Sequence, residues 1–275
     1  LSGINYDITS RKKDEEAVRL AQLQLAVQLA ETERINEELA QYAYVVSHDL
    51  KAPLRAIRNY ADFLYDDLAA TLTGDQKKYL EGLMTAVDQG DKLISDLLSF
   101  SRIGRVPLEI ETTDVPAVVG EVRSLLDLPA EVEITVNSQW PDFSVDRTLF
   151  KQILQNLISH GVKFTPRNPN RIEIGWQEAP ENRIDIFVRD NGIGIDPQYR
   201  QQIFRIFQRL HTDRDYEGTG IGLAIVRKAA QKLGGAVRLE SEPGKGSTFY
   251  VRLPQEGTQK EKEVRSGESN DGIYY

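Results

Sequence analysis

The stretch that decides the fold is "YVVSHDLKAPLRAI", from Tyr44 to Ile57, where a histidine and an aspartate stand side by side in a helical pattern that also contains Pro53. A proline inside a helix removes one backbone donor and crowds the carbonyl four residues earlier, which costs about 3 kcal/mol. His48 lies five residues before this proline, and Asp49 follows it directly. We therefore expect a long helix that carries an adjacent His–Asp pair just before a point where it can bend.

Apolar residues on both sides of this stretch recur at alternating spacings of three and four, which is the pattern of a coiled-coil seam. The seam in the first helix is made up of Val18, Ala21, Leu25, Gln28, Thr32, Ile35, Leu39, Tyr42 and Val46. A second seam comprises Leu80, Leu83, Val87, Gly90, Ile94 and Leu97 and should end near Gly104 and Pro107. Two long helices joined by a turn near residues 71–74 form an antiparallel hairpin, and two hairpins form a four-helix bundle. This half of the chain is therefore predicted to form a homodimer.

The chain from about residue 108 to residue 254 mixes strand and helix patterns. Strand-like alternation occurs in residues 131–136, 171–176, 183–190, 234–242 and 246–253. Apolar residues at helical spacing occur in residues 146–164 and 221–233. This order predicts a two-layer sandwich of helices on one sheet. The predicted fold class is α+β, with a coiled coil and helical hairpin followed by a two-layer α/β sandwich.

Composition excludes several classes of protein. The chain has 275 residues, 40% of them hydrophobic and 28% charged, which suits about two globular domains. No apolar run approaches the roughly 20 residues of a membrane-spanning helix, so no membrane anchor is expected. The absence of cysteine excludes disulfides and fits a cytoplasmic protein, and the net charge of −8 disfavours binding to nucleic acid. A chain that starts with Leu1 is expected to be a fragment of a longer protein.

A single histidine on a helix is most simply a solvated surface residue, but the neighbours of His48 indicate reactivity. Asp49 can orient or deprotonate the imidazole, and an unperturbed imidazole, with a pKa of about 6.5, is largely neutral and nucleophilic at pH 7. The stretch "SHDLKAPLRAI" resembles the H-box of the sensor histidine kinases. The resemblance implies that His48 takes the γ-phosphate of ATP, that Asp49 is its acid/base partner, and that the bend at Pro53 lets the helix flex between catalytic states. Many relatives have Thr or Asn where this chain has Ala52, which predicts weak phosphatase activity.

Three glycine clusters lie in the second half of the chain: "RDNGIGI" at 189–195, "GTGIGLA" at 218–224 and "PGKGST" at 243–248. Taken singly, "DNG" is a hairpin signal and "PGKG" a plain turn. No apolar strand precedes "GTGIGLA", which disfavours a Rossmann site, and no GxxxxGK[ST] occurs, which disfavours a P-loop. A glycine-rich stretch that opens onto a helix can still hold phosphates through its free backbone N–H groups.

Together and in this order, the clusters resemble the N, G1, F and G2 boxes of the histidine-kinase ATP-binding domain, whose fold is shared with gyrase. The resemblance covers residues 41–254, and the wording of residues 207–226 is similar to the phytochrome-like branch. It implies ATP and Mg²⁺ as cofactors. The residues that it assigns to this site are Asn156, His160, Lys163, Asp190, Gly192, Gly194, Gly218, Gly220, Gly222 and Leu223.

Within this set, the resemblance gives each residue type a role. Asp190 would accept a hydrogen bond from the adenine amino group, Lys163 and the glycines of 218–222 would meet the phosphates, and Asn156 would hold the metal. Phe204 and Phe207 match the F-box, although buried helix aromatics would give the same pattern. His211 is interpreted as a surface or lid histidine.

The N-box departs from the family pattern. Relatives commonly read NLxxNAxKF, whereas residues 156–164 read "NLISHGVKF", so His160 replaces the second asparagine. Mg²⁺ prefers hard oxygen ligands, and an imidazole nitrogen is a poor substitute. We expect reduced kinase activity. Two alternatives remain: a pseudokinase that acts as a dimeric signalling scaffold, and a gyrase-like ATPase module without phosphotransfer, which the H-box disfavours.

These interpretations divide the chain into five parts. Residues 1–10 resemble the exit of a PAS sensor domain, whose last strand often ends in Asp-Ile-Thr, and residues 11–40 form a coiled-coil signalling helix. Residues 41–107 form the dimerisation and phosphotransfer domain, and residues 108–254 the ATP-binding domain. The polar tail 255–275 is predicted to be disordered. The family implies an aspartate on the receiver domain of a response regulator as the phosphoryl acceptor.

Overall fold

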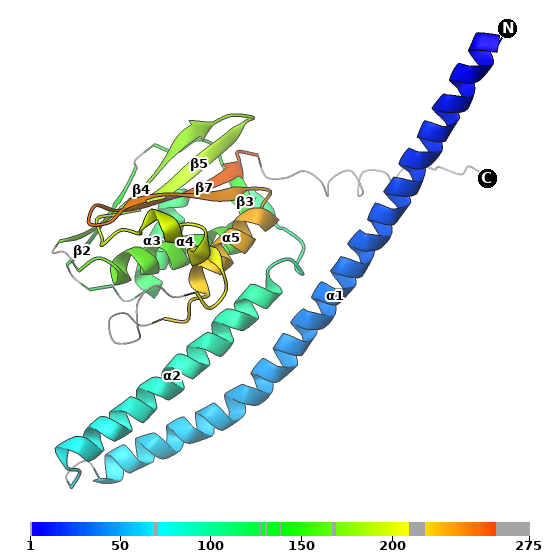
Figure 1. Cartoon of the computed structure of the whole chain (residues 1–275). Coiled ribbons are helices and arrows are strands. Elements are labelled where there is room, and N and C mark those ends of the chain that lie inside the picture. The colour runs from blue at the N-terminus through cyan, green and yellow to red at the C-terminus, as the bar shows by residue number, and fades with distance from the viewer. Residues whose placement is uncertain are drawn as a thin grey trace, which may run out of the picture. The chain divides into compact units, whose positions relative to one another are not determined.

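The computed structural model describes residues 2–68, 71–126, 128–129, 131–137, 139–166, 169–208 and 218–256. In chain order, the elements are α1 (Ser2–Leu68), α2 (Gly74–Arg102), β1 (Ile110–Thr112), α3 (Val115–Leu125), β2 (Val132–Val136), β3 (Ser144–Asp146), α4 (Arg147–Lys163), β4 (Asn170–Ala179), β5 (Arg183–Asp190), η1 (Pro197–Tyr199), η2 (Gln202–Phe204), α5 (Gly222–Lys232), β6 (Ala236–Glu242) and β7 (Gly246–Pro254) (Figure 1). The chain divides into two compact units, Leu1–Asp49 and Leu50–Tyr275. In the described part of the chain, no helix combines the length and apolar character that crossing a membrane requires.

The first unit is helical throughout its described residues, 2–49. Residues 2–10 are therefore helical, and the strand expected at a PAS exit is not formed here. A strand needs a neighbour for its backbone hydrogen bonds, and every described strand lies between residues 110 and 254, whereas a helix satisfies these groups within itself. The seam residues Val18, Leu25 and Ile35 are 57%, 58% and 52% exposed in this single chain.

The predicted hairpin is present in the second unit, where the end of α1 packs against α2. Thr73 caps α2: its hydroxyl accepts from the backbone N–H of Gln76, at 3.4 Å, and the Gln76 side chain accepts from the N–H of Thr73, at 2.9 Å. This capping box fixes where α2 begins. Across the hairpin, Arg58 of α1 pairs with Asp88 of α2. After α2 ends, Gly104 takes a positive φ of 110°, as expected of a residue that terminates a helix.

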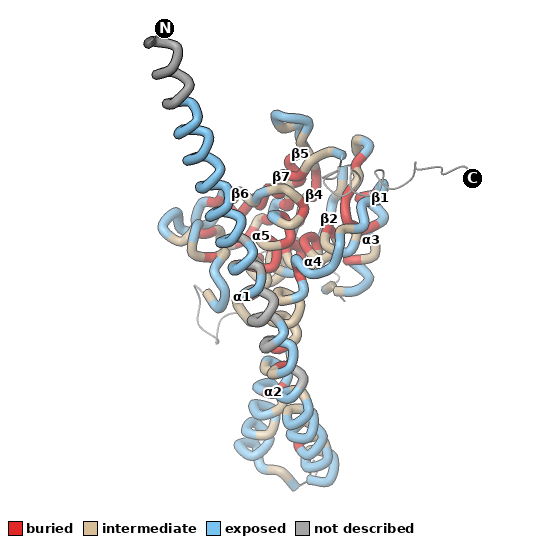
Figure 2. The backbone as a smooth tube through the Cα atoms, turned by 90° about the vertical axis from the view of Figure 1, so that its right-hand side faces the viewer, coloured by how far each residue is buried: buried red, intermediate tan, exposed pale blue. Residues whose placement is uncertain are grey.

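The rest of the second unit is built on a five-stranded sheet of order β2-β4-β5-β7-β6. Strands β2 and β4 are parallel, and the other neighbours are antiparallel. Helices α3, α4 and α5 cover one face of this sheet, and Figure 2 shows that the buried residues gather there. A small second sheet pairs β1 with β3. The predicted two-layer α/β sandwich is therefore confirmed.

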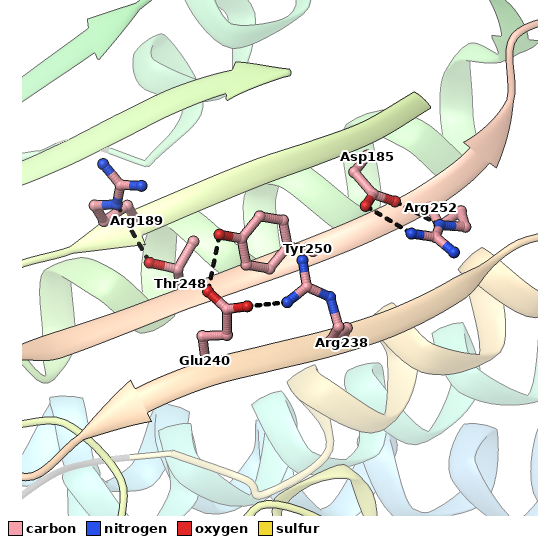
Figure 3. A network of polar contacts seen from close by, with 7 residues as sticks. All are labelled: Asp185, Arg189, Arg238, Glu240, Thr248, Tyr250 and Arg252. Atoms are coloured by element: carbon pink, nitrogen blue, oxygen red, sulfur yellow. Dashed lines mark hydrogen bonds and ion pairs between the residues drawn. The ribbon is translucent and has the colours of Figure 1, made fainter. Parts of the chain in front are cut away.

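The opposite face of the sheet carries an ordered layer of polar side chains (Figure 3). Arg252 donates two hydrogen bonds to Asp185, at 2.7 and 2.9 Å, and this contact lowers the pKa of the buried Asp185 carboxyl below its ordinary value. The guanidinium of Arg238 stacks on the ring of Tyr250, 3.8 Å from its centroid. Glu240 accepts hydrogen bonds from both of these residues. The layer ties β5, β6 and β7 together from the side that the helices leave open.

Candidate functional site

A pocket of about 170 Å³ opens beside α4 and the start of α5. Every residue that the sequence assigned to ATP binding lines it except Gly192. Gly192 does not line the pocket, but its backbone N–H donates to the carboxylate of Asp190, which does, over 2.9 Å. The assigned residues come from three separate segments of the chain, 156–163, 190–194 and 218–223, and are gathered around one cavity.

Asp190, the last residue of β5, supplies the buried charge of this pocket. It is only 6% exposed, and its Oδ1 accepts from the N–H groups of Gly192, at 2.9 Å, and Ser247, at 3.2 Å. Burial raises the pKa of the carboxyl to about 6, although these two hydrogen bonds oppose the rise. With Oδ1 engaged, Oδ2 is the oxygen left to accept a hydrogen bond from a ligand. The hairpin interpretation of "DNG" is wrong, because β5 pairs with β4 and β7 and the chain leaves it for η1.

Two glycines allow the turn between β6 and β7 to pack against the loop that follows Asp190. A Cβ on Gly194, whose φ is +72°, would lie 2.0 Å from the carbonyl oxygen of Glu242. A Cβ on Gly246, whose φ is +99°, would lie 2.1 Å from the carbonyl oxygen of Asp190. "PGKGST" is therefore a turn, as one reading had it, and it also brings Ser247 to Asp190. Sequence reasoning missed Ser247 because its backbone, which carries no residue-specific signal, makes the contact.

The other end of the pocket is suited to phosphates. A Cβ on Gly218 would lie 2.7 Å from Nζ of Lys163, so this glycine lets the loop approach the lysine closely. Helix α5 begins at Gly222, and no side chain caps its first N–H groups. Uncapped N–H groups at a helix N-terminus attract anions. Lys163 and the glycine-rich loop are therefore neighbours in the pocket, where the sequence predicted that they would meet the phosphates.

Asn156 fits a role as an oxygen ligand for Mg²⁺. Its Nδ2 donates to the backbone carbonyl of Gln152, at 2.8 Å, which leaves Oδ1 as the free end of the amide. Oδ1 lies 2.7 Å from where a Cβ on Gly222 would be, so it faces the start of α5. Among the described residues, no group of three or more His, Asp or Glu could hold a metal. A metal here would therefore depend on Asn156 and on the phosphate oxygens themselves.

His160 lines the pocket but packs as an aromatic residue. Its ring centroid lies 4.5 Å from that of Phe164 and 5.2 Å from that of Phe249, the latter edge to face. Burial, together with the charge of Lys163, lowers the pKa of His160 to about 3. The imidazole is therefore neutral at pH 7, and it brings no oxygen to the site.

The proposed phosphoacceptor lies on α1, in the first unit of the chain. His48 and Asp49 are consecutive helical residues, and Asp49 is exposed. Pro53 lies inside the same helix, where it removes the N–H that would bond to the carbonyl of Asp49. The helical context predicted for the "SHDLKAP" stretch is therefore confirmed.

The two F-box phenylalanines differ in environment. Phe204 ends η2, and its ring meets Phe249 edge to face at 6.4 Å, against the core. Phe207 is 57% exposed and has a φ of +63°, so the buried-aromatic interpretation is wrong for this residue. His211 and the tail from residue 257 onward, which was predicted to be disordered, lie outside the described residues.

Two family models match the chain. Residues 38–105, which contain His48, match the model described as "His Kinase A (phospho-acceptor) domain". Residues 145–257, which contain the pocket residues Asn156 to Leu223, match the model described as "Histidine kinase-, DNA gyrase B-, and HSP90-like ATPase". The two matches overlap the domains predicted at residues 41–107 and 108–254, and residues 106–144 lie in neither match.

Individual relatives agree with these matches. The chain is 40% identical to cyanobacterial phytochrome B of Nostoc sp., over 90% of this chain and 32% of that protein. It is 39% identical to phytochrome-like protein Cph1 of Synechocystis sp., over 86% of this chain and 32% of that protein. The chain thus spans about a third of the length of these relatives.

Among solved structures, the chain resembles full-length ShkA in complex with AMPPNP. The TM-score is 0.61 and the identity 28%, over 79% of this chain and 46% of ShkA. The helical hairpin lies in the residues that match the phospho-acceptor model, and the pocket residues from Asn156 to Ser247 lie in the residues that match the ATPase model. The chain belongs to the sensor histidine kinases, in their phytochrome-like branch.

Proposed function

We propose that the chain phosphorylates its own His48 from ATP and passes the phosphoryl group to an aspartate on a response regulator. The observation that carries the proposal is that one chain contains both an H-box, in the segment that matches the phospho-acceptor model, and a pocket lined by Asp190, Lys163 and glycines, in the segment that matches the ATPase model. Neither part alone would support a kinase, because a pocket of this family also serves ATPases.

The reaction joins one ring nitrogen of His48 to the γ-phosphorus and breaks the bond between that phosphorus and the oxygen that leaves with ADP. Asp49 holds the other ring nitrogen and keeps the attacking nitrogen free of its proton. Such transfers depend on positioning and on neutralising charge. Asp190 orients the adenine, while Lys163 and the first N–H groups of α5 hold the phosphates. Mg²⁺, when bound through Asn156, would neutralise the charge that develops on the phosphate oxygens.

A homodimer forms the second part of the proposal. The exposed seam residues of α1, such as Val18 and Leu25, follow coiled-coil spacing, and apolar residues in that pattern are buried when two helices pair. The mass of the chain in solution, measured by light scattering, tests this point directly. Twice the monomer mass supports the dimer, and a monomer at micromolar concentration contradicts it.

A scaffold without kinase activity is the second candidate. His160 favours it, because this residue supplies a neutral ring packed on two phenylalanines where relatives supply an amide. A scaffold would bind ATP and dimerise without forming phosphohistidine.

The test is incubation with γ-labelled ATP and Mg²⁺, followed by treatment of the labelled chain with acid and with alkali. We expect label that is labile in acid, stable in alkali and absent from His48→Ala, while His48→Ala still binds ATP. A wild-type chain that binds ATP but stays unlabelled, together with an unlabelled His160→Asn chain, rejects the kinase in favour of the scaffold.

A further inference from the structure

One wall of the nucleotide pocket comes from outside the ATP-binding domain. Lys92 and Asp96, both on α2, line the pocket together with Asn156 and Lys163. These α2 residues are four apart, so they lie on the same face of the helix, one turn from each other. The glycine clusters and the N-box gave no indication of either residue.

Contacts with α5 and with the loop before it hold α2 in this place. Thr219 donates from its hydroxyl to Asp96, at 2.6 Å, from within the glycine-rich loop. Lys228 donates to the carbonyl of Phe100, at 2.8 Å, and its ammonium lies 4.1 Å from the centre of that ring. One turn further along α5, and just past the end of α2, Lys232 donates to the carbonyl of Gly104, at 3.3 Å.

The register of these contacts places Lys92 at the phosphate end of the pocket. Residue numbers rise together along α2 and α5, so the helices run side by side in the same direction (Figure 1). Both lysine contacts join residues 128 apart. Lys92 lies one turn before Asp96, whose partner Thr219 stands three residues before Gly222, the first residue of α5. The N-terminus of α5 is where uncapped N–H groups favour an anion.

Charge supports the same assignment. Lys92 is exposed at the pocket wall and forms no ion pair with any residue that the structure describes. Asp96 keeps its negative charge, and its carboxylate accepts from the hydroxyl of Thr219, which ties it to the glycine-rich loop. His160 adds no positive charge at pH 7, so Lys163 and Lys92 are the cations that line this pocket among the described residues.

We propose that α2 supplies Lys92 as a second phosphate-binding cation of the nucleotide site, with the Asp96–Thr219 hydrogen bond positioning it. The proposal rests on the nucleotide role of the same pocket in the proposed function. It makes the helix that follows the phosphoacceptor helix a direct part of the ATP site. Nucleotide binding and the position of α2 are then coupled, because each stabilises the other.

The test measures the dissociation constants of ATP, ADP and adenosine with the whole chain, by isothermal titration in Mg²⁺. Lys92→Ala should weaken ATP binding about fivefold, which is typical of a partly exposed charge contact, and leave adenosine binding unchanged. Lys92→Arg should restore most of the ATP affinity. Lys78→Ala is the matched control, because Lys78 is an exposed lysine of α2 that does not line the pocket, and it should change nothing.

Equal ATP affinity in Lys92→Ala and wild type overturns the proposal, and so does an equal loss for adenosine, because that would report damaged packing. Failure of the proposed function gives a different result. In that case, wild type binds ATP and Lys92→Ala binds it more weakly, yet neither chain forms phosphohistidine. A wild-type chain that binds no nucleotide overturns both.

Discussion

Replacing Asp190 by asparagine separates the two roles that this side chain combines, a fixed support for the backbone and a charged acceptor for adenine. Oδ1 receives two backbone N–H groups, from Gly192 and Ser247. In Asp190→Asn the amide oxygen must face these donors, so the NH₂ group must face the pocket. The adenine amino group, itself a donor, would then meet another donor.

The magnitudes follow from this geometry. The variant loses a hydrogen bond to a charged acceptor and gains an opposed donor, together about 3 kcal/mol, which corresponds to about 100-fold weaker ATP binding. The free energy of unfolding of Asp190→Asn, unlike its affinity for ATP, should not fall relative to wild type. The folded pKa of about 6 lies above the ordinary value of 3.8, so the folded chain holds a proton that the unfolded chain has released between these pH values. Wild-type stability therefore falls as pH rises through this window, by up to about 3 kcal/mol, and the variant escapes that loss.

The assays are isothermal titration with ATP at pH 7.5 and denaturant unfolding at pH 5 and 7.5. Asp190→Asn should bind ATP about 100-fold more weakly at pH 7.5 and be at least as stable as wild type at that pH. Wild-type affinity should also decline as pH falls below about 6, where Asp190 takes up its proton. ATP affinity in Asp190→Asn within twofold of wild type would refute the placement of adenine at this carboxylate.

Three further predictions concern neighbouring parts of the second unit. His160→Asn should raise the autophosphorylation rate about tenfold, because it restores an oxygen ligand for the metal. It should also lower the free energy of unfolding by about 1 kcal/mol, because the aromatic contacts of His160 are lost. An unchanged rate would show that the metal does not need a ligand at this position. Gly194→Ala should lower the free energy of unfolding in urea by more than about 2 kcal/mol, because residue 194 has a positive φ and its new Cβ would meet a carbonyl oxygen of β6. The control Gly120→Ala has open space around its Cβ and should be neutral or stabilising. Equal effects of the two substitutions would contradict this reasoning. Asp185→Asn should lower the free energy of unfolding by about 1–2 kcal/mol at pH 7, because the ion pair with Arg252 is lost. This difference in stability from wild type should disappear as the pH falls through the lowered pKa of Asp185. A constant difference down to pH 2 would argue against the ion pair.

Long, strongly patterned elements were readable from the sequence. The alternation in β5 and β7 and the helical spacing in α4 and α5 predicted a sheet with helices on one side, and the seams predicted the hairpin. Helix α3 was missed although Asp114 caps it and a proline follows at its start, both of which are helix-start signals. Strands β1 and β3 have three residues each and pair across a long separation, so no local pattern marks them.

Pocket residues whose own side chains carry the chemistry could be assigned from sequence motifs. Residues that reach the pocket only through the packing of separate elements could not. Asp190, Asn156 and Lys163 were assigned from their motifs, and they line one pocket. Lys92 was missed because its role depends on how α2 lies beside α5, which no single motif records. The strand expected at residues 2–10 is helical, because a strand depends on neighbours that the local sequence does not supply.

The central claim is that His48 receives the γ-phosphate of ATP. The most direct measurement is mass-spectrometric mapping, at neutral to alkaline pH, of the chain after reaction with ATP and Mg²⁺. The account predicts phosphate on the peptide that contains His48, attached to the imidazole and lost on brief acid treatment. Phosphate on another residue, or none on a chain that binds ATP in the same buffer, would contradict it.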